Sequence, residues 1–213
     1  MPIYNGIEYL SESISTVMSQ TYLDWELLIG INGHPPKSEV FNIANEYSSE
    51  KIIVKDFPYL KGKSATLNEL LTVSKYDIIC LLDVDDLWAP NKLLFQLPYI
   101  GMYDVVGTNF EYFGDSTATP QMIMGEVYEQ HFRLFNTIVN SSCMIAKRNR
   151  GIFWSSYWDG VEDYDLWIRL VKQGWFFFNV DEVLVKHRIH SDSFYNTKNK
   201  KLSEKLKLEW FGQ

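Results

Sequence analysis

A run of five apolar residues, 78–82, passes directly into three aspartates within four positions, and this junction constrains the fold more than any other feature of the sequence. A continuous apolar run of this length is typical of a strand that is buried on both faces, as in a parallel sheet. Asp83, Asp85 and Asp86 then emerge at the carboxyl end of that strand, where α/β sheets bind their ligands. The junction predicts an α/β protein with an acidic site at the edge of its sheet.

The segments ahead of this junction alternate between strand and helix patterns. Apolar runs at 25–31 and 52–54 predict strands, and apolar residues at helical spacing predict helices near 10–18, 40–47 and 64–72. Asn5 and Glu8 have the spacing of a capping box for the first helix. The alternation predicts a mostly parallel central sheet flanked by helices.

The second half of the chain is less regular. Short strands are expected near Val105, Phe110 and Met144, and helices at 126–135, 163–173 and 202–210. We expect the strands of this half to form a small antiparallel part of the fold. With 213 residues, of which 46% are hydrophobic, the chain suits one domain with one substantial core.

Composition argues against several classes of protein. The net charge of −7 argues against a general affinity for nucleic acid. Cys80 and Cys143 are too few for a disulfide-stapled secreted domain, so we expect a cytoplasmic location. No apolar stretch approaches the roughly 20 residues of a membrane span, and the first nine residues lack a signal-peptide pattern.

The three aspartates favour a cation site. Carboxylates concentrated beside a buried strand are costly unless a cation neutralises them, and hard oxygen ligands suit Mn²⁺ or Mg²⁺. The alternative is a solvated acidic turn that caps the helix expected after Pro90.

The acidic turn lies in a longer string that resembles the D-x-D block of family 2 glycosyltransferases, including the W-x-P-x-K-L that follows it. Other landmarks of that family occur in the family's order: Pro2-Ile3-Tyr4-Asn5-Gly6, Ser19-Gln20-Thr21-Tyr22, the Lys61-Gly62-Lys63 turn with Asn68, Glu162-Asp163-Tyr164-Asp165-Leu166-Trp167-Ile168-Arg169, and Arg188-Ile189-His190. The resemblance covers residues 2–193 and implies the GT-A fold of nucleotide-diphospho-sugar transferases.

For the donor, the resemblance implies a nucleotide sugar, commonly a uridine diphosphate (UDP) sugar, bound by residues 1–100. The positions that it assigns to the nucleotide sugar are Pro2, Tyr4, Glu8, Asn32, Lys61, Lys63, Asp83 and Val84. Asp85 matches the direct metal ligand, with Asp83 and His190 as further members of the Mn²⁺ or Mg²⁺ site. The alternatives are exposed lysines at 61 and 63 and a structural histidine at 190.

For the acceptor, the resemblance implies a site in residues 101–198. Asp163, preceded by Glu162, matches the base that deprotonates the attacking hydroxyl in a single inverting displacement. The alternative is an acidic residue that stabilises only the start of a helix. A free glycan, a glycoprotein or a lipid-linked saccharide could each be the acceptor. The helix within 199–213 could lead to further domains.

The chain departs from the family pattern at two places. Family members begin with a short apolar strand ahead of the segment that matches Pro2 to Gly6, and this chain has no room for it. Asn32 stands where paired aspartates usually contact the base. Such a minimal domain is similar to glycosyltransferases of chlorella viruses, which implies capsid or surface glycan synthesis in the host cytoplasm.

Two other functions compete with this prediction. A sugar nucleotidyltransferase on a similar sheet would need a glycine-rich, basic triphosphate loop, and Asn5-Gly6 alone does not supply one. A non-catalytic carbohydrate-binding or nucleotide-sugar-binding module of the same fold would not need Asp83, Asp85, Asp163 and His190 together.

Overall fold

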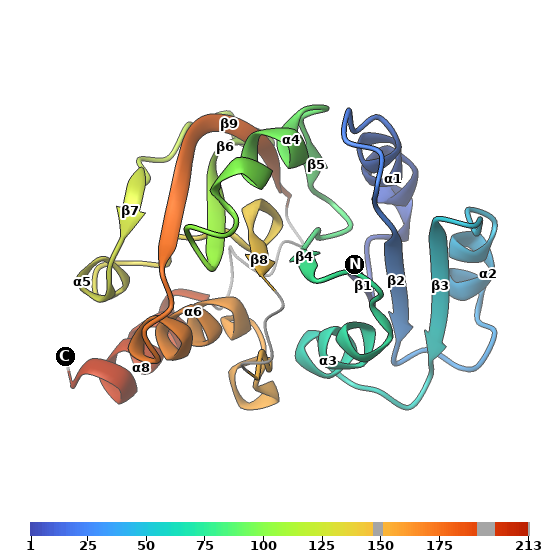
Figure 1. Cartoon of the computed structure of the whole chain (residues 1–213). Helices are drawn as coiled ribbons and strands as arrows, with labels where there is room; N and C mark the ends of the chain where they lie inside the picture. The colour runs from blue at the N-terminus through green and yellow to red at the C-terminus, as the bar shows by residue number, and fades with distance from the viewer. Residues whose placement is uncertain (147–150, 191–198, 213) are drawn as a thin grey trace.

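The computed structural model describes residues 1–146, 151–190 and 199–212, which form two sheets lying side by side (Figure 1). The first is parallel, with the order β1-β2-β3, and contains β1 (Pro2–Ile3), β2 (Leu27–Asn32) and β3 (Ile52–Phe57). The second is mixed, with the order β4-β8-β6-β9-β5, and β7 pairs with β9. Its strands are β4 (Ile78–Cys80), β5 (Leu87–Trp88), β6 (Val105–Gly114), β7 (Gly125–Val127), β8 (Met144–Ala146) and β9 (Phe177–Ile189).

Helices cover both sheets. They are α1 (Leu10–Met18), α2 (Glu39–Asn45), α3 (Lys63–Val73), α4 (Lys92–Gln96), α5 (Glu129–Phe132), α6 (Glu162–Lys172) and α8 (Asn199–Phe211). Of these, α2 contacts β2 and β3, α3 contacts β1 and β2, and α6 contacts α5 and α8. The short 3-10 turns are η1 (Ile7–Tyr9), η2 (Leu97–Tyr99), η3 (Asn140–Ser142) and η4 (Ser156–Trp158). The α/β class and the antiparallel pairing in the second half are confirmed. The expectation that the run 78–82 belongs to the parallel sheet is wrong, because β4 pairs antiparallel with β8 at the end of the second sheet and its residues are only partly buried.

Several predicted elements differ from the observed ones. The capping box is wrong, because Gly6 precedes η1 in a left-handed conformation (φ 85°) and no side chain caps that turn. The helix expected at 126–135 shortens to α5, because Gly125–Val127 pairs with β9. The strands expected near Val105 and Phe110 are one strand, β6, which lies parallel to β9. The long strand β9 is not among the predicted elements.

Two hydrophobic cores fill the molecule. One lies around the first sheet and includes Ile3, Ile14 and Ile29, all at most 1% exposed. The other lies around α6 and includes Trp154 and Trp167. The first core also includes Val106, Met144 and Val185 of the second sheet, so it joins the two sheets, and the acidic turn 83–86 follows β4 between them.

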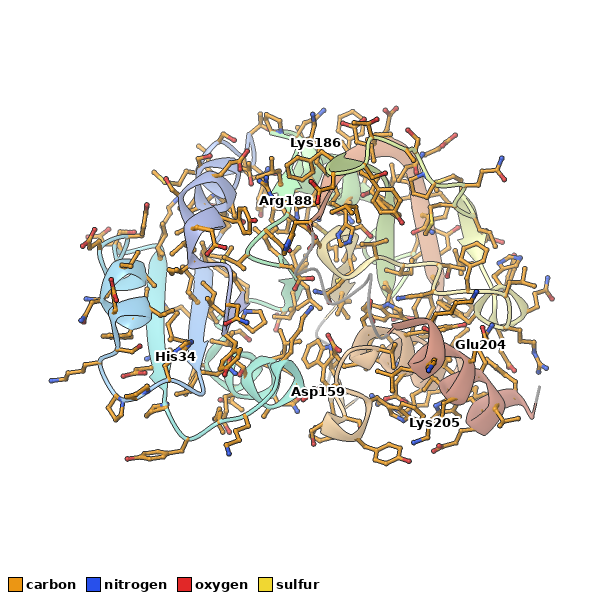
Figure 2. All side chains as sticks on the ribbon, turned by 180° about the vertical axis from the view of Figure 1, so that it is seen from behind. His34, Asp159, Lys186, Arg188, Glu204 and Lys205 are labelled. Carbon is orange, nitrogen blue, oxygen red and sulfur yellow. The ribbon has the colours of Figure 1, made fainter. Side chains whose placement is uncertain are left out.

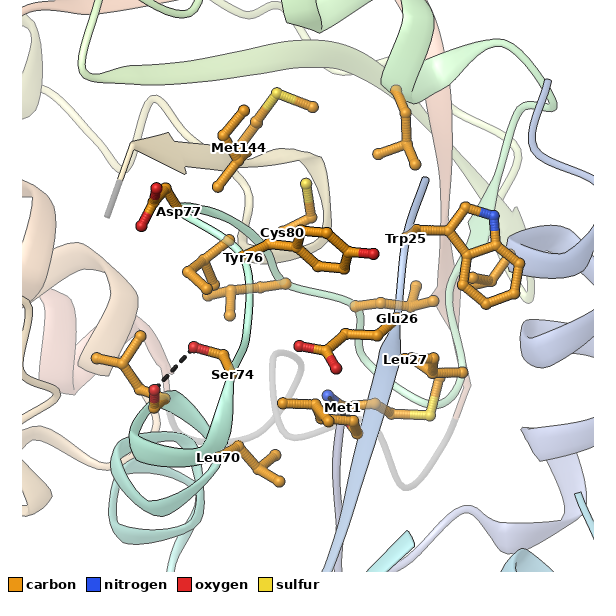
Figure 3. A pocket seen from close by; sticks show the side chains of 18 of the residues that line it. Met1, Trp25, Glu26, Leu27, Leu70, Ser74, Tyr76, Asp77, Cys80 and Met144 are labelled. Atoms are coloured by element: carbon orange, nitrogen blue, oxygen red, sulfur yellow. Dashed lines mark hydrogen bonds between the residues drawn. The ribbon is translucent and has the colours of Figure 1, made fainter. Parts of the chain in front are cut away.

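A cavity of about 260 Å³ separates the two sheets (Figure 3). Its walls come from Leu27 and Leu28 of β2, from Ile78 and Cys80 of β4, and from Leu70 of α3, with many other apolar side chains. The strand β1 pairs with β2 only from Gly30 onward, and β4 ends the strand order of the second sheet. The strand β1 has two residues, and the cavity lies beside Leu27 and Leu28, the part of β2 that precedes this pairing.

The amino group of Met1 lies at this cavity. It donates a hydrogen bond to the carbonyl of Leu28 at 2.9 Å, and the carbonyl of Met1 accepts one from Gly30. Burial lowers the pKa of this amino group to about 5, with a smaller opposing effect from Asp83.

Within the part of the chain that the structure describes, no helix has both the length and the apolar character needed to cross a membrane.

The contact between β2 and α3 depends on Gly30. A Cβ atom at this position would lie 2.7 Å from Cγ2 of Thr66 and 3.2 Å from Cδ1 of Leu70. We predict that Gly30→Ala lowers the free energy of unfolding by about 1–3 kcal/mol through overpacking, measured by urea denaturation.

The control is the double variant Gly30→Ala with Thr66→Ser. Thr66→Ser removes the Cγ2 atom but keeps a hydroxyl group. In the wild-type protein the hydroxyl of Thr66 donates a hydrogen bond to the carbonyl of Gly62. Part of the lost stability should return. Equal stability of Gly30→Ala and the wild-type protein would show that α3 can move away from the sheet without cost.

Candidate functional site

The acidic turn begins with Asp83, which several donors hold. Its carboxylate lies 2.6 Å from Nζ of Lys63 and accepts a hydrogen bond from Nδ2 of Asn140 at 2.9 Å. Its backbone N–H donates to Oγ of Ser141. Burial alone would raise the pKa of Asp83, but Lys63 and Asn140 hold it below its usual range. Asp83 is therefore ionised at neutral pH.

Asp85 lies in a different environment. Burial, together with the charges of Asp86 and Asp83, raises the pKa of Asp85 above its usual range. Nε2 of His190 lies 3.1 Å from Oδ2 of Asp85, so the structure brings two of the predicted metal ligands together although 105 positions separate them. The crowding of negative charge at Asp85 is the kind that a bound cation relieves.

Asp86 has a structural role in the same turn. It is fully buried and accepts hydrogen bonds from Oγ of Ser141 and from the backbone N–H of Arg188. Nδ1 of His187 lies 3.0 Å from its carboxylate. Burial would lower the pKa of His187, but Asp86 raises it to about 9, so the pair is ionic at neutral pH. This pair fixes the acidic turn to the end of β9.

Lys63 connects the acidic turn with the start of α6. Its Nζ lies 2.6 Å from Asp83 and 3.3 Å from Oε1 of Glu162. Burial would lower the pKa of Lys63, but Asp83 and Glu162 together raise it above its usual range. A permanently charged lysine thus links a carboxylate from the first half of the chain to one from the second.

The position of Lys63 is fixed through the N-terminus of α3. Oδ1 of Asp159 accepts a hydrogen bond from the backbone N–H of Ser64 at 3.1 Å, although the two residues are 95 positions apart. Asp159 lies beside the start of α3 (Figure 2). Further along α3, Asn68 exchanges two hydrogen bonds with the backbone of Trp154. These contacts tie the helix that carries Lys63 to the second half of the chain.

Asp163 is the second residue of α6. Its carboxylate accepts hydrogen bonds from Nδ2 of Asn136 at 2.9 Å and from the N–H of Tyr164 at 2.7 Å. Burial and the charge of Glu162 raise the pKa of Asp163 to about 7, against smaller opposing effects of Lys63 and Asn136. A carboxyl group with this pKa can take up or release a proton at neutral pH.

The other residues predicted to bind the nucleotide sugar lie along the first sheet and its loops, except Val84, which lies in the acidic turn. Pro2 and Asn32 belong to β1 and β2, and Asn32 is buried at 3% exposure. Tyr4 is exposed, with its ring 5.1 Å from that of His34. The remaining three are exposed Glu8, exposed Lys61 and buried Val84. Of the two predicted lysines, Lys63 is the one that contacts the acidic turn.

Sequence analysis assigned no role to Arg188, which comes from the end of β9 (Figure 2). Its guanidinium group stacks between the rings of Tyr9 and Phe113, at 4.5 and 4.2 Å. Nε donates to the backbone carbonyl of Asp85 at 3.0 Å, and a terminal nitrogen contacts Glu12. The motif Arg188-Ile189-His190 could have indicated the role of Arg188, because both polar side chains of this motif contact Asp85.

The site holds few protein ligands for a metal. Among the described residues, no group of three or more His, Cys, Asp or Glu side chains has the arrangement of a metal site. Asp85 and His190 are nevertheless adjacent, and Mn²⁺ or Mg²⁺ commonly completes its coordination with substrate phosphates and water. The donor set fits such an ion when a phosphate-bearing ligand is present. Residues 147–150 and 191–198 of the predicted acceptor half lie outside the described residues.

Comparison with known proteins places this site in a family. The model of "Glycosyl transferase family 2" matches residues 1–156. The chain is similar to the UDP-Glc:alpha-D-GlcNAc-diphosphoundecaprenol beta-1,3-glucosyltransferase WfgD of Escherichia coli, with 27% identity over 99% of this chain and 82% of the relative. It is also similar to the O-antigen biosynthesis glycosyltransferase WbnJ of Escherichia coli, with 29% identity over 91% and 79%.

Solved structures share the fold. TarS of S. aureus in complex with UDP has a TM-score of 0.71 and 14% identity, over 99% of this chain and 64% of TarS 1–349. The mannosyltransferase PcManGT of Pyrobaculum calidifontis in complex with GDP-Man and Mn2+ has a TM-score of 0.67 and 14% identity, over 92% and 57%. The chain thus spans less than two thirds of each of these solved chains.

These relatives confirm the predicted GT-A fold and the predicted glycosyltransferase class. They come from bacteria and archaea, so they give no support to the viral origin suggested by the small size of the domain. Because the family model covers well over half of the sequence, the chain belongs to glycosyl transferase family 2.

Proposed function

We propose that this enzyme transfers a sugar from a UDP-sugar to an acceptor hydroxyl, with a divalent metal at the donor diphosphate and inversion at the anomeric carbon. One observation carries the proposal. Lys63 joins Asp83, beside the proposed metal ligand Asp85, to Glu162, beside the proposed base Asp163. Lys63 thus ties the turn that carries the proposed metal ligand to the helix that carries the proposed base, and a single displacement needs both groups at one site.

On the donor side, we assign Asp85 and His190 as metal ligands, with Asp83 beside them. A bound Mn²⁺ or Mg²⁺ supplies neutralisation of the charge on the leaving diphosphate. Lys63 holds a positive charge against Asp83 in the same acidic turn, where it can add to the neutralisation of the diphosphate. We assign to the nucleotide sugar five residues along the first sheet and its loops, together with Val84 of the acidic turn: the five are Pro2, Tyr4, Glu8, Asn32 and Lys61.

On the acceptor side, Asp163 takes the proton of the attacking hydroxyl. The hydroxyl oxygen forms a bond to the anomeric carbon while the bond from that carbon to the diphosphate oxygen breaks, and UDP leaves with the bonding electrons. A base with a pKa near 7 combines an adequate ionised fraction with a strong drive to accept a proton. Glu162 raises that pKa and is fixed by the backbone N–H of Gly160.

The named activities of the relatives support one class of acceptor. WfgD is named for a diphosphoundecaprenol-linked acceptor and WbnJ for O-antigen biosynthesis. We therefore propose a lipid-linked saccharide of a surface glycan as the acceptor. The donor of WfgD is named as UDP-glucose, which makes this conjugate the first one to test.

The donor site has a direct test. We predict that UDP and UDP-glucose bind with an affinity that depends on Mn²⁺ and that Asp85→Asn or His190→Ala abolishes this dependence, because each removes a metal ligand. The measurement is isothermal titration with and without the metal.

Asp181→Asn is the matched control, because Asp181 is an exposed carboxylate of β9. Its affinity should equal that of the wild-type protein. Binding that ignores both the metal and Asp85→Asn would reject the metal-dependent donor site. Binding of UDP-sugars without release of UDP in the presence of acceptor would favour a non-catalytic module.

The proposed base gives a second prediction. Asp163→Asn should lower kcat by about 10²–10⁴-fold while the affinity for UDP stays unchanged, because a general base contributes this much. In the wild-type enzyme, kcat/KM should rise with pH through an apparent pKa near 7, since only the ionised carboxylate accepts the proton. An acceptor-dependent rate that survives in Asp163→Asn would assign the base elsewhere.

The same residue makes a prediction that needs no substrate. The pKa of Asp163 is about 7 in the folded protein, against roughly 3.9 for an unfolded aspartate. Between these values the folded state binds more protons than the unfolded state, so Asp163 reduces stability as pH rises through this range. Asp163→Asn should therefore raise Tm at pH 8 and change it less at pH 5. Calorimetry at the two pH values measures the difference, and an equal change at both would contradict the raised pKa.

A further inference from the structure

Residues 136–142, which connect α5 to β8, reach both sides of the proposed site. Nδ2 of Asn136 donates to Oδ2 of Asp163 at 2.9 Å, and Nδ2 of Asn140 donates to Oδ1 of Asp83 at 2.9 Å. The two carboxamides lie four positions apart in the sequence, and each is bonded to a different proposed functional carboxylate.

Ser141 strengthens the contact on the donor side. Its Oγ donates to Oδ2 of Asp86 at 2.5 Å and accepts from the backbone N–H of Asp83 at 3.0 Å. The hydroxyl is therefore used as both donor and acceptor, as its chemistry allows. Together with Asn140, it holds the acidic turn at both ends.

The segment is itself held by side chains from four elements. Four of its backbone carbonyls accept hydrogen bonds from buried side chains: Thr137 from Asn179 at 2.8 Å, Ile138 from Trp167 at 3.0 Å, Ser141 from Trp88 at 2.7 Å and Ser142 from Gln96 at 2.8 Å. These donors belong to β9, α6, β5 and α4. A loop tied at so many points has little freedom, so it can hold its own polar side chains in fixed positions.

We propose that Asn136 and Asn140 are positioning residues of one rigid segment, which sets the base Asp163 and the acidic turn in register for the same displacement. The proposal rests on the proposed function. Asn136 acts on the acceptor side, since its hydrogen bond favours the ionised form of Asp163. Asn140 acts on the donor side, since it orients Asp83 next to Asp85.

The two sides predict different signatures for the two variants. Asn136→Ala should move the rising limb of the kcat/KM profile to higher pH and leave the Mn²⁺-dependent affinity for UDP unchanged. Asn140→Ala should weaken that affinity, or the affinity for Mn²⁺, by about 10–100-fold and leave the pH profile unchanged, as for other outer-shell partners of a metal site. Titration calorimetry and pH-dependent initial rates with UDP-glucose measure the two effects.

Three further measurements separate positioning from simple destabilisation. Asn42→Ala is the matched control, because Asn42 is an exposed amide of α2 that donates to the backbone carbonyl of Lys37. Asn140→Asp, which cannot donate to Asp83 when ionised, should weaken binding more than Asn140→Ala does. In Asn136→Ala, the part of the pH dependence of Tm that comes from Asp163 should move to higher pH, because the pKa of Asp163 rises. This measurement needs no turnover.

The outcomes are distinguishable. If the wild-type protein neither binds uridine nucleotides nor transfers sugar, the proposed function is wrong and this proposal falls with it. The wild-type protein can instead be active while Asn136→Ala and Asn140→Ala have the same effects on affinity and pH profile, or no effect on either. These results overturn the positioning roles, while the proposed function stands.

Discussion

The ionic contact of Lys63 with Asp83 and Glu162 is the interaction on which the site depends. Asp85, Asp86 and Asp163 lie close to these two acids, and partly buried carboxylates in such number repel one another and lose hydration. The ammonium group of Lys63 offsets this cost by contacting both Asp83 and Glu162. The hydrogen bond between Asp159 and the start of α3 fixes the position of this lysine. Removal of the lysine would leave uncompensated charge on both sides, so the two halves need each other electrostatically as well as sterically.

The acids of the site are not equivalent, and their surroundings explain the division. Asp86 is satisfied on all sides by protein donors and serves the structure of the turn. Asp85 and Asp163 have raised pKa values, because burial and like charges act on them with too little compensation. A carboxylate in this state is available to bind a cation or a proton. The proposed chemistry assigns the cation to Asp85 and the proton to Asp163.

The sequence was sufficient for features that depend on local patterns. The alternating strand and helix patterns of residues 10–72 predicted the α/β class, and the aspartates after the apolar run 78–82 predicted the place of the acidic turn. It was not sufficient for β9, where exposed charged residues interrupt the apolar positions of a long strand. It also could not show that Asn136 and Asn140 reach Asp163 and Asp83, because such contacts join irregular segments and leave no periodic signal.

The buried amino group of Met1 has a practical consequence for protein engineering. A peptide fused ahead of Met1 must start inside the apolar space between the sheets, beside Glu26 and Leu70. A flexible, polar affinity tag would bring hydrated groups into that space, and its last residues would compete with the side chains that now line it. The helix α8 lies at the far edge of the molecule (Figure 1), so a purification handle placed after it would leave the boundary between the sheets undisturbed.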